Sequence, residues 1–143
     1  MNELNYASLE ASKKLVENGI WLETDYFYVN TFSNMGWVFR QKGGFNDEDD
    51  FIPAPSMAEV WRELPDGINV NGSWAVLFAN KQTQGISVGF RIEHHIIVCF
   101  DRENPADALI ELWVWLEKEK LRETEAVKKD PVIDKNSAAY MDN

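Results

Sequence analysis

The chain has 143 residues, the length of one ordinary domain, and 45% of them are hydrophobic, a proportion typical of a globular protein. Acidic residues outnumber basic ones by 24 to 14, which gives a formal net charge of −10 and leaves no basic cluster that could replace the counterions of a phosphate backbone. This balance argues against direct nucleic-acid binding and against anionic membranes, and the single cysteine, Cys99, excludes an intrachain disulfide.

No segment of the sequence indicates export or a membrane span. The first residues lack the apolar region of a signal peptide, and no apolar run approaches the roughly 18–20 residues that cross a bilayer. The longest apolar runs, at 96–100 and 108–116, have the size of core elements. We therefore expect a cytoplasmic protein.

The first predicted elements are a helix and a hairpin. Apolar residues at helical spacing predict a helix over 8–18, and Gly19 follows where a glycine ends many helices. Residues 25–32 and 36–42 are rich in aromatic and β-branched residues, which favours strands. The short stretch Ser33-Asn34-Met35-Gly36 predicts the turn that joins these strands into a hairpin.

A second helix is predicted after the acidic stretch 47–50. Pro53 and Pro55 fix the entry of the chain, because proline cannot continue a helix backwards. Ser56 and Glu59 form the S-x-x-E pattern of a capping box, in which each side chain accepts a hydrogen bond from the other residue's backbone amide. Apolar residues then recur at helical spacing and predict one buried stripe: Met57, Val60, Trp61 and Leu64.

A second hairpin and a further strand follow. Residues 73–80 and 85–92 alternate between apolar and polar side chains on either side of a short polar loop, which is typical of antiparallel strands with one buried face. The positions predicted to be buried are Trp74, Val76, Phe78, Ile86, Val88, Phe90 and Ile92. Another strand is predicted at 96–100, directly after Glu93-His94-His95.

The strongest local signal predicts a third helix that begins at Asn104. Asparagine suits the N-cap, Pro105 suits the first helical position, and Asp107 places negative charge at the positive end of the helix dipole. Charged residues at 117–129 extend the helix until Asp130-Pro131 ends it. Its main apolar stripe consists of Leu109, Leu112, Trp113 and Leu116.

These elements predict an α+β fold, with an antiparallel sheet of about five strands in hairpins and three helices packed on it. The length favours a single α+β domain at 1–120, followed by a charged helical extension and C-terminal tail at 121–143. No βαβ unit with a glycine-rich turn is visible, so a doubly wound parallel sheet is not expected.

His94, His95 and Cys99 have the most conspicuous chemistry. A zinc site needs three or four converging ligands, and adjacent residues on a strand point to opposite faces. Cys99 lies in an apolar strand, where burial raises a thiol pKa, so we expect it to be a buried, structural thiol. The acidic stretch 47–50 lacks the glycine of a calcium-binding loop and is predicted to be a solvated loop. No catalytic motif is present, so the sequence predicts no cofactor, metal site or catalytic residue and favours a non-enzymatic role.

A candidate interface lies on the third helix. Three further apolar residues fall outside its main stripe: Ile110, Val114 and Trp115. A helix that is apolar around most of its circumference is either central in the fold or covered by a partner. Two alternatives remain: these residues form a contact with another subunit, or the first helix or the C-terminal segment covers them. Three other tryptophans are in phase with core positions and are expected in the core: Trp61, Trp74 and Trp113.

Two segments resemble a pattern found in short, uncharacterised proteins of bacteriophages, prophages and mobile elements of gut-type bacteria. They are IPAPSMAEVWRELP at 52–65 and NPADALIELWVWLEKE at 104–119, in this order. SLEASKKLVENGI at 8–20 and the aromatic strand DYFYV also fit, so the resemblance covers 8–120. The long charged extension after Leu116 departs from the pattern. The resemblance implies a protein of phage or mobile-element type and carries over no activity, substrate or site residue.

The sequence therefore favours a protein that acts through protein–protein contact, either with another protein or with a second copy of itself. One alternative is an acidic mimic of nucleic acid that occupies a basic host protein, which the charge of −10 suggests. The other alternative is a small enzyme in which His94 or His95 works with carboxylates.

Overall fold

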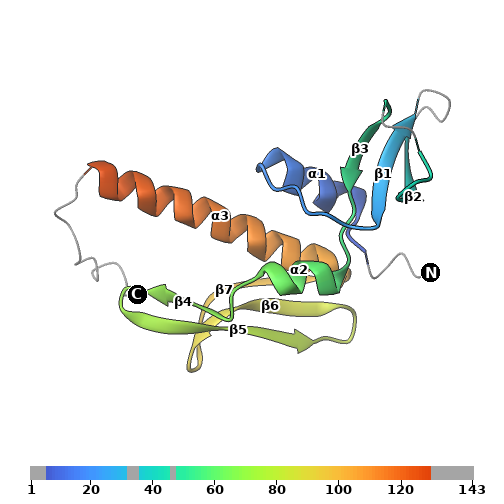
Figure 1. Ribbon diagram of the computed structural model, residues 1–143. Helices are drawn as coiled ribbons and strands as arrows, with labels where there is room; N and C mark the ends of the chain where they lie inside the picture. Colours follow the sequence, from blue (N-terminus) through green and yellow to red (C-terminus); the bar gives the residue numbers. More distant parts are fainter. Residues whose placement is uncertain (1–5, 32–35, 46–47, 130–143) are drawn as a thin grey trace.

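The computed structural model describes residues 6–31, 36–45 and 48–129, with side chains up to residue 120 (Figure 1). Its helices are α1 (Leu9–Glu17), α2 (Met57–Glu63) and α3 (Pro105–Lys129). Its strands are β1 (Tyr26–Thr31), β2 (Gly36–Gln41), β3 (Asp50–Pro53), β4 (Gly67–Val70), β5 (Ser73–Lys81), β6 (Ile86–Ile92) and β7 (His95–Arg102). The predicted turn residues 33–35, Asp47, Asp130-Pro131 and the tail lie outside the described residues.

The α+β class is confirmed, but the strands form two antiparallel sheets where one was expected. The three-stranded sheet has the order β2-β1-β3, and the four-stranded sheet has the order β4-β5-β6-β7. The two strands that were not predicted are β3 and β4, which are short and lie at the edges of their sheets. In Figure 1 the two sheets lie at opposite ends of the described part of the molecule, with the helices between them.

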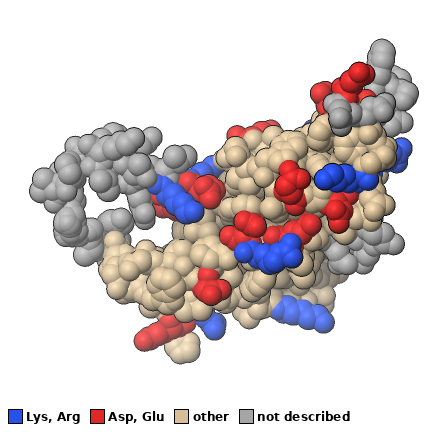
Figure 2. Space-filling view, in the orientation of Figure 1, with Lys and Arg blue, Asp and Glu red and all other residues tan. Residues whose placement is uncertain are grey.

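Charged side chains of both signs are mixed on the surface that Figure 2 shows. Acidic side chains gather in small groups, and Lys or Arg side chains lie among them. On this face, the excess of acidic residues is therefore not arranged as one continuous strip.

The predicted starts of α2 and α3 and the predicted end of α1 are confirmed. The Ser56 Oγ atom accepts a hydrogen bond from the Glu59 amide at 3.1 Å, and the Glu59 carboxylate accepts one from the Ser56 amide at 2.9 Å, which completes the capping box. The Asn104 Oδ1 atom accepts hydrogen bonds from the first turn of α3. Gly19 follows α1 with a φ of 79°, a left-handed conformation that glycine adopts without strain.

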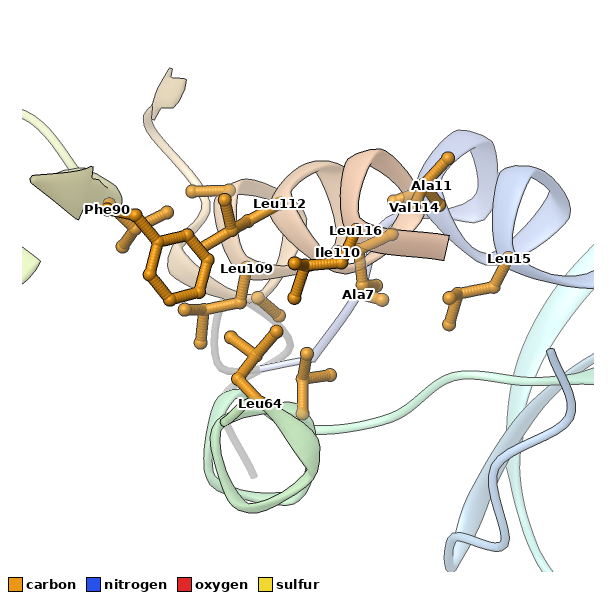
Figure 3. Packing of buried hydrophobic residues seen from close by; sticks show 14 of the residues in the cluster. Ala7, Ala11, Leu15, Leu64, Phe90, Leu109, Ile110, Leu112, Val114 and Leu116 are labelled. Atoms are coloured by element: carbon orange, nitrogen blue, oxygen red, sulfur yellow. The ribbon is translucent and has the colours of Figure 1, made fainter. Parts of the chain in front are cut away.

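Helix α3 lies at the centre of the hydrophobic core. It runs between α1, α2 and one face of the four-stranded sheet, so side chains on several sides of the helix are covered (Figure 3). Phe90 approaches α3 from the sheet, Leu64 from α2 and Leu15 from α1. The buried residues of α3 are Ala106, Ala108, Leu109, Ile110, Leu112, Val114 and Leu116. Among the described residues, no helix is both long and apolar enough to cross a membrane.

The N-terminal segment at residues 6–8 joins the beginnings of α2 and α3. The Ala7 amide donates a hydrogen bond to the Pro55 carbonyl at 2.8 Å, just before α2. The Ser8 amide donates to the Asp107 carboxylate at 2.8 Å, and the Asn104 side-chain amide donates to the Tyr6 carbonyl at 2.9 Å. The residues that start α3 therefore also hold the entry of the chain into α1.

Glu111 of α3 is bound from two other elements. Its carboxylate lies 2.7 Å from the Lys14 Nζ atom of α1 and 3.1 Å from an Arg102 guanidinium nitrogen at the end of β7. Burial by itself raises the pKa of Glu111, but the hydrogen bonds and positive charges of Lys14 and Arg102 outweigh burial and hold this pKa below its ordinary value. The charged form of Glu111 therefore stabilises the packing of α1 and β7 on α3.

We expect Glu111→Gln to lower the free energy of unfolding at neutral pH by about 1 kcal/mol, because the Lys14 and Arg102 contacts lose their charge. A lowered folded-state pKa gives stability that is present above the ordinary value of 4.5 and is lost as the pH falls below it. Urea unfolding at several pH values should therefore show a difference between variant and wild type that shrinks below about pH 4.5. The control is Glu117→Gln, whose exposed ion pair with Lys120 should contribute little.

Candidate functional site: the open face of the four-stranded sheet

One face of the four-stranded sheet is covered by α3 and α2, and no described element covers the other face (Figure 1). Ala75, Val88 and Phe90 are buried on the covered face. We call the other surface the open sheet face. According to the strand register, its side chains are Asn69, Trp74, Val76, Phe78, Asn80, Ser87, Arg91, Ile96, Cys99 and Asp101.

The open sheet face exposes three large apolar side chains. Trp74 is 59% exposed, Val76 is 48% exposed and Ile96 is 53% exposed. Val76 and Ile96 lie in one row across the sheet, with Arg91 between them, because Arg91 pairs with both residues. Single exposed apolar residues are common on protein surfaces, but a group of them on a rigid sheet indicates a contact surface.

The prediction that Trp74 and Val76 are buried was wrong, and the strand register gives the reason. Phe90 of the covered face pairs with Leu77, so Leu77 and its i±2 neighbours on β5 also point toward α3. These neighbours are alanines, and Ala75 is fully buried beneath the helix. Both alternating sets of side chains on β5 are apolar, and the smaller set faces the core.

Phe78 is also on the open sheet face, but little of it is exposed. The Arg91 guanidinium lies over the Phe78 ring, 5.4 Å from its centroid, and covers part of it. A second close contact lies at the end of the face, where a Cβ atom on Gly67 would approach the Trp74 ring to 2.5 Å. The Trp74 indole therefore lies against the Gly67 backbone, and only glycine leaves room for it there.

Cys99 is exposed on the open sheet face, so the prediction of a buried thiol was wrong. A bulge between β6 and β7 lets Ile97 and Val98 both pack against the core, after which Cys99 points outward. The Cys99 Sγ atom lies 2.9 Å from the Ser87 Oγ atom, which donates a hydrogen bond to the Asp101 carboxylate. These three residues form a polar corner beside the apolar part of the face.

The stripe predicted for α2 is only half confirmed. Val60 and Leu64 are buried, whereas Met57 is 40% exposed and Trp61 is 42% exposed. The helix has only seven residues and meets the sheet at its β5–β6 end, so the outer part of the stripe extends past the core. Together with Ala79, Ile86 and Leu109, the two exposed residues line an apolar depression of about 410 Å³ on the helix-covered side.

The candidate interface on α3 is not at the surface of the molecule. Ile110 and Val114 are buried in the core between α1, α2 and the sheet, as in the alternative in which the first helix covers them. Trp115 is half-buried and packs against the same core, and so does Trp113. Ile110 and Val114 are therefore part of the hydrophobic core of this chain.

The residues considered for catalysis or metal binding do not come together. His94 and His95 are exposed at the β6–β7 turn, away from the Ser87–Cys99–Asp101 corner in the register of the sheet. Asp50, expected in a solvated loop, begins β3 and pairs with Asn30. Within 6–31, 36–45 and 48–129, no group of three or more His, Cys, Asp or Glu side chains is arranged to hold a metal ion.

Comparison of the chain with models of known protein families, with curated proteins and with solved structures gave no match. The role of the open sheet face is therefore argued from its own geometry.

A pair of substitutions on α2 tests the corrected placement of its stripe. Leu64→Ala should lower the free energy of unfolding by about 2–4 kcal/mol, because it leaves a cavity in the core. Trp61→Ala removes a larger but half-exposed side chain and should cost about 1 kcal/mol. Urea unfolding of both variants checks the order, and a larger loss for Trp61→Ala would contradict the placement of this side chain.

Proposed function

We propose that this protein acts through protein–protein contact and that the open sheet face is the contact surface. The observation that carries the proposal is the exposure of Trp74, Val76 and Ile96 together on one rigid sheet. Covering these side chains removes apolar area from water, which is the main favourable term in protein association. Because the sheet is held by α3 from behind, the surface needs little ordering when a partner binds.

The composition of this face resembles the centre of a protein interface. Tryptophan and arginine are residues that often dominate interface energies, and this face carries both, with Trp74 against the Gly67 backbone and Arg91 over the Phe78 ring. Polar groups lie at both ends of the face, with Asn69 beside Trp74 at one end and Asn80 beside the Ser87–Cys99–Asp101 corner at the other. An apolar centre with a polar rim is the usual anatomy of a specific interface.

The two alternative functions have less support. A mimic of nucleic acid needs its acidic groups arranged along one surface, and the face in Figure 2 mixes them with Lys and Arg. An enzyme that uses His94 or His95 needs carboxylates and a cleft around them, whereas His94 lies exposed in the β6–β7 turn and His95 lies exposed at the start of β7. The phage or mobile-element type and the cytoplasmic location remain predictions from the sequence.

A photo-crosslinking amino acid placed at position 74 tests the proposal in the cells from which the chain comes. We expect one defined protein adduct, because this position lies in the proposed contact. The control is the same amino acid at Lys118, which is exposed on α3 on the other side of the sheet and should give no such adduct. The adduct at 74 should be lost when Val76→Asp is added. Equal labelling from 74 and 118, or no adduct from 74, would contradict the proposal.

A further inference from the structure

We infer that the partner of the open sheet face is a second copy of this chain, bound face to face about a two-fold axis that lies across the strands. This inference rests on the proposed function and names its partner. The axis passes over the row formed by Phe78, Gly89 and Cys99, which pair with one another in the strand register. A two-fold arrangement uses the same patch on both subunits, so the patch must be complementary to itself.

The charges of the open sheet face meet this requirement. Arg91 lies one row to one side of the Phe78–Gly89–Cys99 row, and Asp101 lies one row to the other side, on the neighbouring strand. Rotation about the axis exchanges the two outer rows and brings Arg91 toward the partner's Asp101. The same contact occurs twice in the dimer. On each face the charges of Arg91 and Asp101 cancel, although the whole chain carries a net charge of −10.

The distances allow this contact. Adjacent strands lie about 4.8 Å apart, and two packed sheets lie about 10 Å apart. An arginine and an aspartate that point toward each other from the two sheets span this separation, including the step to the next strand. Asp101 already accepts a hydrogen bond from Ser87, which holds its carboxylate in place on the face. The Arg91 guanidinium lies over Phe78 in the single chain and turns toward the partner in the dimer, and the central row offers no charged side chain to oppose the approach.

The size of the face predicts a weak dimer. The nine residues of β5 at about 3.3 Å each and four strands at about 4.8 Å give a flat area of at most about 570 Å² per copy. Two copies therefore bury at most about 1,100 Å² in total, at the lower end of specific interfaces. We expect dissociation in the micromolar range, with monomers at high dilution.

Sedimentation equilibrium from low to high micromolar concentration tests the inference. Wild type should form dimers, and Arg91→Glu or Asp101→Lys should each weaken the dimer at least about tenfold, because each places like charges opposite each other. The double variant Arg91→Glu/Asp101→Lys should restore dimerisation, since it only exchanges the two signs. Lys118→Glu is the matched control, because it makes the same change of charge on α3 and should leave the dimer intact.

The outcomes separate this inference from the broader proposal. The wild-type chain could stay monomeric and give an adduct with a different protein from position 74. This result would overturn the inference that the partner is a second copy, but it would support the broader proposal of protein–protein contact. A dimer that is equally stable in wild type and both single variants, or that is not restored in the double variant, would overturn this interface. Circular dichroism of each variant verifies that its fold is intact.

The single cysteine gives an independent measurement of the same geometry. Cys99 lies on the row under the axis, so the two copies bring their thiols close together. A short bis-maleimide should therefore link wild-type chains into a covalent dimer, should fail with Cys99→Ser, and should link less in Arg91→Glu than in the double variant. Modification of Cys99 without linked dimers, at concentrations where sedimentation shows dimers, would overturn this placement of the axis.

Discussion

The structure depends on the need to cover α3 on nearly all sides. Its buried residues occupy successive positions around the helix, so a single sheet face cannot shield them all. The four-stranded sheet covers one side, and α1 and α2 cover the others (Figure 3). The polar contacts of α3 follow the same arrangement, because Asn104, Asp107 and Glu111 each bind a residue from another element. Hydrophobic packing and hydrogen bonding therefore both fix the position of α1 relative to α3.

Because α1 and α2 both lie around α3, no element in the described part of the chain covers the outer face of the four-stranded sheet. An antiparallel sheet with one solvated face usually carries polar side chains there. In this protein, Trp74, Val76 and Ile96 are exposed there, beside polar residues such as Asn69 and Arg91. A second face-to-face sheet would complete a four-layer assembly of helix, sheet, sheet and helix. The same constraint that determines the core thus explains the position of the candidate site.

Sequence reasoning identified most of the local structure but did not predict which side chains of the second sheet are exposed. It found the hairpins and all three helices, because the capping box at Ser56, the N-cap at Asn104 and the glycine after α1 each depend on neighbouring residues. It missed β3 and β4, which are short edge strands. They form by pairing with β1 and β5, and this pairing is not visible in the local sequence. It left open whether Ile110 and Val114 form a contact with another subunit or are covered within the chain, and the structure buries both in the core.

The sequence by itself determined where the helices begin, which segments form the five longer strands, and that α3 would be central or covered. These properties follow from periodicity and capping within a few residues. Only the tertiary structure decided which of the two apolar sets on β5 faces the core, and the register that pairs Leu77 with Phe90 settles it. It also decided that the bulge near Ile97 turns Cys99 outward. Both outcomes depend on contacts between strands that are distant in sequence, and a one-residue change in such a contact moves every side chain to the opposite face.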